Sequence, residues 1–314
     1  MNIILLGYNG LIGRSILNEL FKYYKKKSNF KLTCVGRNIE YKPYKFKKIE
    51  YIKWNFLKFQ RSKLQFFRKK NIIINCIGKN HGDIDNLEKV NSIFIEKLVK
   101  YIKNNKISAH LIHLSSVSVY GSQKKYINQI KNISENTVTR ADDLYSKSKL
   151  KADFSIEREL INKHKNFSFT ILRISNVVSE LKVSNSFRLI KLLLNKGIWF
   201  RYSNNTNYHF INVKDVALSV LLCVKKHKKS KNKIYIVSDD INQFKLHKIY
   251  AKKFKLFTII VPSRLLTKMI KYFPLPKKIF NFFLIISSQV LYNNNKIRKD
   301  LGFNPRYSLK DKIL

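Results

Sequence analysis

The sequence has few acidic residues, few cysteines and no long apolar run. Its 314 residues include 19 aspartates and glutamates against 63 lysines and arginines, a net charge of +44. The three cysteines are scattered, so they form neither a disulfide framework nor a metal-binding spacing. No uncharged apolar stretch reaches the roughly 18 residues of a membrane helix. The most apolar segment, 279–290, predicts a buried or amphipathic helix instead.

The first residues also lack the features of a secretory signal. Met1–Leu6 runs directly into an apolar stretch, without a basic segment before it or a cleavage site after it. Together with the low cysteine content, this pattern predicts a cytoplasmic protein without a transmembrane segment.

The excess of positive charge by itself favours a polyanionic partner. The lysines, however, are spread over the whole chain and accompany many Ile, Asn, Tyr and Phe residues, a composition that AT-rich coding favours. We therefore interpret the charge as compositional drift rather than as selected nucleic-acid binding. Nonspecific binding to polyanions follows in either case, and no specific nucleic-acid partner is predicted.

Apolar runs alternate with helical patterns along the first part of the chain. Strands are predicted at 2–6, 30–35, 49–54, 71–77, 110–114 and 167–174, and helices at 12–25, 87–104 and 144–163. This alternation predicts an α/β fold with a doubly wound parallel sheet over residues 1–176. Residues 177–314 are predicted to form a smaller, mostly helical domain, with a return to the first domain around 207–240.

A glycine-rich loop joins the first predicted strand to the first predicted helix. Gly7, Gly10 and Gly13, three of the nine glycines of the chain, have the spacing GxxGxxG. In this context the glycines permit a tight turn, the approach of a pyrophosphate and close packing of helix on strand. The helix N-terminus, with Leu11 and Ile12, presents N–H groups to the phosphates. The loop therefore predicts a dinucleotide site.

A serine, a tyrosine and a lysine follow the glycine loop along the chain. Their side chains are of the types that carbonyl chemistry uses. Tyr145 and Lys149 are four residues apart on a predicted helix and so share one face. An ammonium group lowers the pKa of a nearby phenol, which makes tyrosine usable as a general acid or base. Ser116 ends a predicted strand, where its hydroxyl can hydrogen-bond the same substrate oxygen.

Together these segments resemble the extended short-chain dehydrogenases/reductases, the NAD(P)-dependent epimerases, dehydratases and reductases of nucleotide sugars. The resemblance covers nearly the whole chain and rests on Gly7–Gly13 (GxxGxxG), Leu114–Gly121 (SSxxVYG), Tyr145–Lys149 (YxxSK), Leu172–Asn176 (LRxxN), His209–Ala217 (FIxVxDVA) and Asn295–Pro305 (SKxRxELGFxP). It implies a Rossmann-like cofactor domain, a C-terminal substrate domain, a nucleotide-sugar substrate and a homodimer.

The resemblance also implies roles for individual residues. Catalysis is implied for Ser116, Tyr145 and Lys149. Cofactor contacts are implied for the glycine loop and for Arg37, Asn55, Ile77, Gly78, Asn91, Tyr145 and Lys149. Substrate contacts are implied for Ser116, Ser118, Asn176, Arg201 and Tyr208. Tyr208 replaces an arginine that binds the substrate diphosphate in many members, which leaves this contact to Arg201 or a lysine.

The residues that follow Ser116 limit which reaction of the family the protein can catalyse. Dehydratases of this type need an additional acid and base, and the corresponding positions hold Val117 and Ser118. Arg37, with no acid before Glu40, favours NADP(H) over NAD(H), because a carboxylate there repels a 2′-phosphate. A consumed NADPH fits net reduction. We therefore predict a 4-keto reductase of surface-polysaccharide (O-antigen or capsule) synthesis, with a UDP-glucose 4-epimerase-like enzyme as the alternative.

Two functions of other classes stay open. A non-catalytic scaffold that binds NADPH structurally would not need Ser116, Tyr145 and Lys149 together, so their presence argues against it. An RNA-associated member of the family would explain the positive charge, but no separate basic domain is visible.

Overall fold

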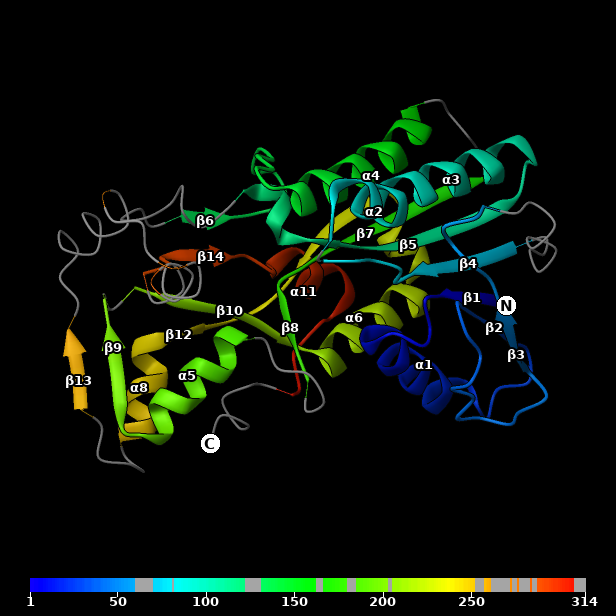
Figure 1. Cartoon of the computed structure of the whole chain (residues 1–314). Helices are drawn as coiled ribbons and strands as arrows, with labels where there is room; N and C mark the ends of the chain where they lie inside the picture. The colour runs from blue at the N-terminus through cyan, green and yellow to red at the C-terminus, as the bar shows by residue number, and fades with distance from the viewer. Residues whose placement is uncertain are drawn as a thin grey trace.

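The computed structural model describes residues 1–59, 70–80, 82–121, 131–161, 166–179, 185–202, 205–251, 257–260 and 287–307, with the single residues 272, 276 and 283. A seven-stranded parallel sheet runs through it in the order β11-β7-β5-β4-β1-β2-β3 (Figure 1). The strands in chain order are β1 (Asn2–Leu6), β2 (Lys31–Gly36), β3 (Ile49–Lys53), β4 (Lys70–Asn75), β5 (Ser108–Ser116), β7 (Phe167–Ile174) and β11 (Lys233–Val237). The order reverses between β1 and β4, which is where Rossmann-like sheets bind dinucleotides.

Both faces of the sheet are covered, and the sequence of β1 shows why. All five residues of β1 are buried. Successive side chains of a strand point to opposite faces, so Ile3 and Leu5 enter one apolar cluster while Ile4 and Leu6 enter the other. A continuous apolar run is therefore required here rather than an alternating one.

Helices form a layer on each face of the sheet (Figure 1). On one face, α1 (Leu11–Tyr24) packs beside α6 (Val213–Lys225), and on the other α3 (Phe94–Asn104) packs beside α4 (Leu144–Ile161). The sequence predicted one helix over 87–104. The structure instead has a short α2 (Ile84–Glu88) and a π-helical turn, η2 (Lys89–Ile93), before α3.

Outside the seven-stranded sheet, the chain contains more strands than the sequence predicted. A three-stranded sheet has the order β12-β10-β8, and two further pairs are β13-β9 and β14-β6. The elements of these smaller sheets and the helices beside them are β6 (Lys131–Ile133), β8 (Asn176–Val178), α5 (Asn185–Asn195), β9 (Ile198–Arg201), β10 (Asn207–Asn212), β12 (Asp239–Asn242), α8 (Gln243–Ala251), β13 (Phe257–Ile260) and β14 (Val290–Tyr292). Two short helices are α7 (His227–Ser230) and α11 (Asn295–Leu301). The apolar segment 279–290, predicted to be helical, lies largely outside the described residues.

The chain leaves the large sheet and later returns to it. After β7 it enters the second domain through β8, and then α6 packs against α1 and β11 pairs in parallel with β7. The segment from β8 to β10 therefore extends from the carboxyl end of the sheet, and α6 leads the chain back along one face of it (Figure 1). Within the described residues, no helix combines the length and the hydropathy that crossing a membrane requires.

Candidate active site

The loop between β1 and α1 excludes side chains at two of its three glycines. Gly7 has a φ of +83°, and a methyl group at Gly13 would lie 2.2 Å from the main-chain oxygen of Gly7. At Gly10 the nearest atom to such a methyl group is 3.4 Å away, in ordinary contact. Gly10 also precedes α1 without a side-chain cap, and the first turn contains no acid. The first N–H groups, at Leu11 and Ile12, have no acceptor within the helix and so suit a pyrophosphate.

Ser116, Tyr145 and Lys149 come together at the carboxyl end of β5. Ser116 is the last residue of β5 and caps the short 3-10 helix η3 (Val117–Tyr120). Tyr145 lies in the first turn of α4, with its phenol beside the hydroxyl of Ser116. Lys149 lies one turn later, is 4% exposed, and donates a 3.0 Å hydrogen bond from Nζ to the main-chain oxygen of Leu114 in β5.

Burial controls the protonation of both titratable groups. It raises the pKa of the Tyr145 phenol, and a hydrogen bond from Ser116 only partly opposes this shift. Burial lowers the pKa of Lys149 to about 8, although Asp153 opposes this change. The sequence predicted that Lys149 would lower the pKa of Tyr145. The structure differs because the loss of hydration dominates at the phenol and the ammonium is bonded to Leu114.

Asn91 connects the end of β4 to the catalytic helix. It lies in the π-helical turn η2 and is 1% exposed. Its Nδ2 donates to the main-chain oxygen of Lys79 at 2.9 Å and to Ser148 Oγ at 3.0 Å, while its Oδ1 accepts the N–H of Lys79 at 2.9 Å. A methyl group at Gly78 would approach Lys149 Nζ to 3.2 Å, so a side chain at this position would crowd the lysine.

The predicted adenosine contacts lie at the ends of β2 and β3. Arg37 is exposed in the loop after β2, and Asn9 of the glycine loop donates a 2.6 Å hydrogen bond to Asn38 Oδ1 in the same loop. The exposed Asn55 uses its Oδ1 locally, to accept the N–H of Leu57 at 3.1 Å. Its contact with adenine stays a prediction.

Ile77 is held next to the glycine loop. Its side chain is buried in the apolar cluster under α3 and α4. Its main-chain nitrogen would lie 3.1 Å from a methyl group at Gly7, so the segment after β4 and the loop after β1 are in close contact. This contact places Ile77 and Gly78 at the switch point of the sheet.

A comparison with protein families shows which family the chain belongs to. The profile of the NAD dependent epimerase/dehydratase family matches residues 3–238. The chain belongs to this family. The matched region includes the glycine loop, Ser116, Tyr145 and Lys149, and all seven strands of the parallel sheet. A search of curated proteins found no match.

Solved structures share the fold of this family member at low sequence identity. UDP-glucuronic acid 4-epimerase from Bacillus cereus, in complex with NAD, has a TM-score of 0.69 and 16% identity, covering 100% of this chain and 94% of its own. For dTDP-glucose 4,6-dehydratase from Bacillus anthracis with NAD the values are 0.68 and 14%, with the same coverage. RMD from Pseudomonas aeruginosa with NADPH gives 0.63 and 14%, covering 99% and 96%.

The residues predicted to bind the substrate of this epimerase/dehydratase family member lie on several separate elements. Asn176 is exposed at the start of β8, just beyond β7. Ser118 Oγ is buried and makes no hydrogen bond to any described residue. Arg201 ends β9. Tyr208 is 3% exposed and packs near Trp199 in the apolar core of the second domain, so its role at the substrate stays a prediction.

A buried ion pair beside Lys149 was missed by the sequence reasoning. Asp153 lies one turn after Lys149 on α4 and is fully buried, and its Oδ2 accepts a 3.1 Å hydrogen bond from Nε of Arg173. Arg173 also donates from Nη1 to the hydroxyl of Tyr120 at 2.9 Å. The available signal was an acid four residues after Lys149, in a chain with only 19 acids.

Proposed function

We propose that the protein is an NADP(H)-dependent reductase that acts on the 4-keto group of a nucleotide sugar. The observation that carries the proposal is the grouping of Ser116, Tyr145 and Lys149 at the carboxyl end of the sheet that also bears the glycine cradle. The nicotinamide cofactor supplies hydride chemistry when bound. Gly10, Leu11 and Ile12 would hold its pyrophosphate.

Each catalytic side chain has a distinct task at the substrate oxygen. Tyr145 donates a proton to the sugar oxygen, and Ser116 hydrogen-bonds the same oxygen and so fixes its position. Lys149 stabilises the negative charge that remains on the phenol oxygen. Because the pKa of Tyr145 is raised, the resting phenol is protonated, which is the form that a reduction requires.

The residues beside Ser116 disfavour dehydration. Val117 is buried and has no proton to transfer, and Ser118 is a hydroxyl rather than a carboxyl group. Neither side chain can protonate a leaving hydroxyl group while the other removes a proton from carbon. The chemistry that remains for this site is hydride exchange at one sugar carbon.

The charge around the adenosine end supports NADP(H). Arg37 is exposed after β2, and the first acid of that loop is Glu40. Arg14 lies with its guanidinium 4.1 Å from the ring centre of Tyr41, close to the glycine loop. Cations at this end of the site favour a 2′-phosphate, which a carboxylate would repel.

The reaction is tested by following NADPH absorbance with UDP-, dTDP- and GDP-4-keto sugars. We expect one substrate class to oxidise NADPH stoichiometrically and Tyr145→Phe to abolish this oxidation. The alternative, a nucleotide-sugar 4-epimerase, would interconvert the 4-epimers without net loss of NADPH. A protein that binds NADPH tightly but converts none of these substrates would instead support the scaffold function.

We assign residues 1–176 to the cofactor domain, to which the chain returns within 207–240 through α6 and β11, and the remainder of 177–314 to the substrate domain. The assignment is supported by the packing of α6 on α1 and the pairing of β11 with β7. A reductase of nucleotide sugars would work in the cytoplasm and supply precursors of a surface polysaccharide.

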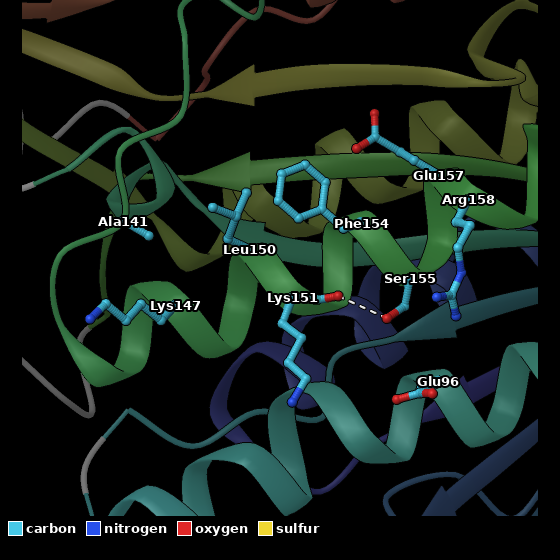
Figure 2. A pocket seen from close by; sticks show the side chains of 9 residues that line it. All are labelled: Glu96, Ala141, Lys147, Leu150, Lys151, Phe154, Ser155, Glu157 and Arg158. Carbon is cyan, nitrogen blue, oxygen red and sulfur yellow. Dashed lines mark hydrogen bonds between the residues drawn. The ribbon is translucent and has the colours of Figure 1, made fainter.

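We further propose that the enzyme is a homodimer that associates through α3 and α4. A hollow of about 820 Å³ lies on this surface, and Figure 2 shows the side chains that line it. Phe154 is 56% exposed there. In this strongly basic chain the same surface includes Glu96 and Glu157 together with Lys147 and Arg158. Groups of both signs on one face allow the self-complementary contact of a twofold dimer.

Sedimentation equilibrium tests this surface. The wild type should sediment as a dimer, and Phe154→Asp should shift it to a monomer, because the new carboxylate enters an apolar contact. Leu192→Asp is the matched control, since Leu192 is 53% exposed on α5 in the second domain. A monomeric wild type, or a Phe154→Asp variant that stays dimeric, would contradict the proposal.

A further inference from the structure

Lys149 carries its ammonium group in a buried environment that disfavours a charge. It is almost fully buried between α4 and the ends of β4 and β5, with its Nζ bonded to the oxygen of Leu114. A buried ammonium without a charged neighbour loses its proton readily, and a neutral amine could neither stabilise a phenolate nor hold a cofactor as a cation. Some group must therefore offset the cost of its burial.

Asp153 is the charged residue placed to do this. It lies one helical turn after Lys149 on the same face of α4, and its exposed fraction is zero. The two groups act on each other, because the carboxylate favours the charged lysine and the lysine favours the charged carboxylate. Asp153 thus lies between two cations, Lys149 on its own helix and Arg173 on β7.

The carboxylate is held by Arg173, which is itself held by Tyr120. Arg173 contacts it from β7, at the position that pairs with Ser115 of β5. The hydroxyl of Tyr120, which is fully buried in η3, accepts a hydrogen bond from the other side of the guanidinium. This chain of contacts joins α4, which carries Tyr145 and Lys149, to the turn that follows Ser116.

We propose that Asp153 is a positioning residue that keeps Lys149 protonated, and that Arg173 and Tyr120 fix its carboxylate for that purpose. The inference rests on the proposed function, in which Lys149 serves Tyr145 and the cofactor. A merely structural ion pair would stabilise the fold but would leave the proton affinity of Lys149 unchanged.

Other titratable groups also face this pair. Around Lys149 these are Cys76 at the end of β4, His113 in β5 and Tyr145 on α4. Around Asp153 they are Glu157 on α4 and Tyr120 in η3, besides Arg173. The neutral His113 and the neutral thiol of Cys76 carry no charge near pH 7, since burial lowers the pKa of the first and raises that of the second. Burial raises the pKa of Asp153 itself, and Arg173 opposes this shift, so Asp153 is the carboxylate that acts on Lys149.

The test measures the protonation of Lys149 without any substrate. In protein labelled with ¹³C at lysine Cε, one resonance should titrate near pH 8, apart from the other lysines, and should be absent in Lys149→Met. In Asp153→Asn this midpoint should fall by about one pH unit or more, a tenfold loss of proton affinity. Glu157→Gln, which removes a carboxylate one turn further along α4, should leave the midpoint near its wild-type value.

The affinity for NADPH provides a second readout. Its decline with rising pH should begin at a correspondingly lower pH in Asp153→Asn than in the wild type. If Asp153→Asn fails to fold because Arg173 is left unpaired, the double variant Asp153→Asn/Arg173→Gln removes both charges and should show the same lowered midpoint. A midpoint of Lys149 that stays at its wild-type value in either folded variant would overturn the inference.

These outcomes separate the inference from the proposed reaction. A shifted midpoint together with no turnover of any 4-keto sugar would refute the reductase and leave the role of Asp153 intact. Turnover of a 4-keto sugar with an unshifted midpoint would support the reductase and refute the role of Asp153.

Discussion

Gly13 lies against the main-chain oxygen of Gly7, so that a methyl group at position 13 would come within 2.2 Å of that oxygen. The same methyl group at Gly10 would be 3.4 Å from its nearest neighbour. The packing of helix on strand thus requires a glycine at position 13, whereas a side chain at Gly10 would enter only the space of the proposed pyrophosphate.

This contrast predicts different outcomes for two alanine variants. Gly13→Ala should lower the free energy of unfolding by about 1–3 kcal/mol or more, because the overlap involves backbone. Gly10→Ala should change it by no more than about 1 kcal/mol, yet weaken NADPH binding at least about tenfold, since the methyl group occupies the approach of the pyrophosphate. Urea unfolding and fluorescence titration measure the two quantities. Undiminished NADPH binding by Gly10→Ala would rule out a pyrophosphate at this loop.

Tyr145→Phe should abolish turnover while NADPH still binds with nearly wild-type affinity. In the proposed reaction the phenol supplies the proton, whereas the aromatic ring that remains in the variant keeps the packing of the first turn of α4. Stopped-flow assays and NADPH titration of the same preparation provide both values. Residual activity above a few per cent of the wild-type rate would show that another group supplies the proton.

Arg37→Asp should exchange the cofactor preference. NADPH affinity should fall by about tenfold or more, because a cation near the 2′-phosphate is replaced by an anion, while NADH affinity should stay the same or improve. Arg188→Asp, on α5 of the second domain, controls for the change in net charge. A wild-type protein that prefers NADH would refute the role of Arg37 and move the 4-epimerase ahead of the reductase.

His110 should make the fold sensitive to acid. Its ring nitrogens lie 2.8 Å from Ser168 Oγ and 3.0 Å from Thr170 Oγ1, and burial, then His227 and Lys231, lower its pKa to about 4. Between pH 4 and its unfolded value near 6.5, the unfolded chain binds more protons than the folded one.

The contribution of His110 to stability is therefore complete above about pH 6.5 and falls by up to about 3 kcal/mol as the pH approaches 4. Urea unfolding at a series of pH values measures this decline. In His110→Gln the decline over this range should be smaller by that amount, because the titrating ring is gone. Parallel curves for the two proteins would show that folding does not lower the pKa of His110.

The net charge of +44 predicts weak, nonspecific RNA binding that salt removes. Filter binding with a random RNA should show an affinity that decreases steeply between about 50 and 200 mM salt. RNA should have no effect on the turnover of the nucleotide sugar. Sequence-selective binding that persists at about 0.2 M salt would show instead that the charge has been selected for a nucleic-acid partner.

The sequence predicts those elements whose local pattern agrees with their place in the fold. The residues of β1 form a continuous apolar run because both faces are covered, and this run identifies the strand without further information. The three residues of β8 and of β14 form strands only through their pairing with β10 and β6. No local pattern marks such short segments, since their partners are distant in the chain.

In the candidate site, too, some residues can be predicted from local sequence and others cannot. Local spacing identifies the three glycines and the pair Tyr145 and Lys149, and the end of a predicted strand identifies Ser116. The structure brings Ser116, Tyr145 and Lys149 together. The pairing of Asp153 with Arg173 joins residues from a helix and a strand whose side chains meet only after packing. The raised pKa of Tyr145 likewise depends on burial, which the sequence alone does not quantify.

The π-helical turn η2 constrains the length of the segment that contains Asn91. Such a turn closes its hydrogen bonds one residue later than an α-helical turn, so Lys89–Ile93 contains a residue more than a regular helix would need. Deleting one residue there would restore a regular helix and remove the widened turn that places Asn91 between Lys79 and Ser148. Asn91 would then lose its hydrogen bonds to Lys79 and Ser148. The segment should therefore tolerate many exchanges of side chains and no insertion or deletion.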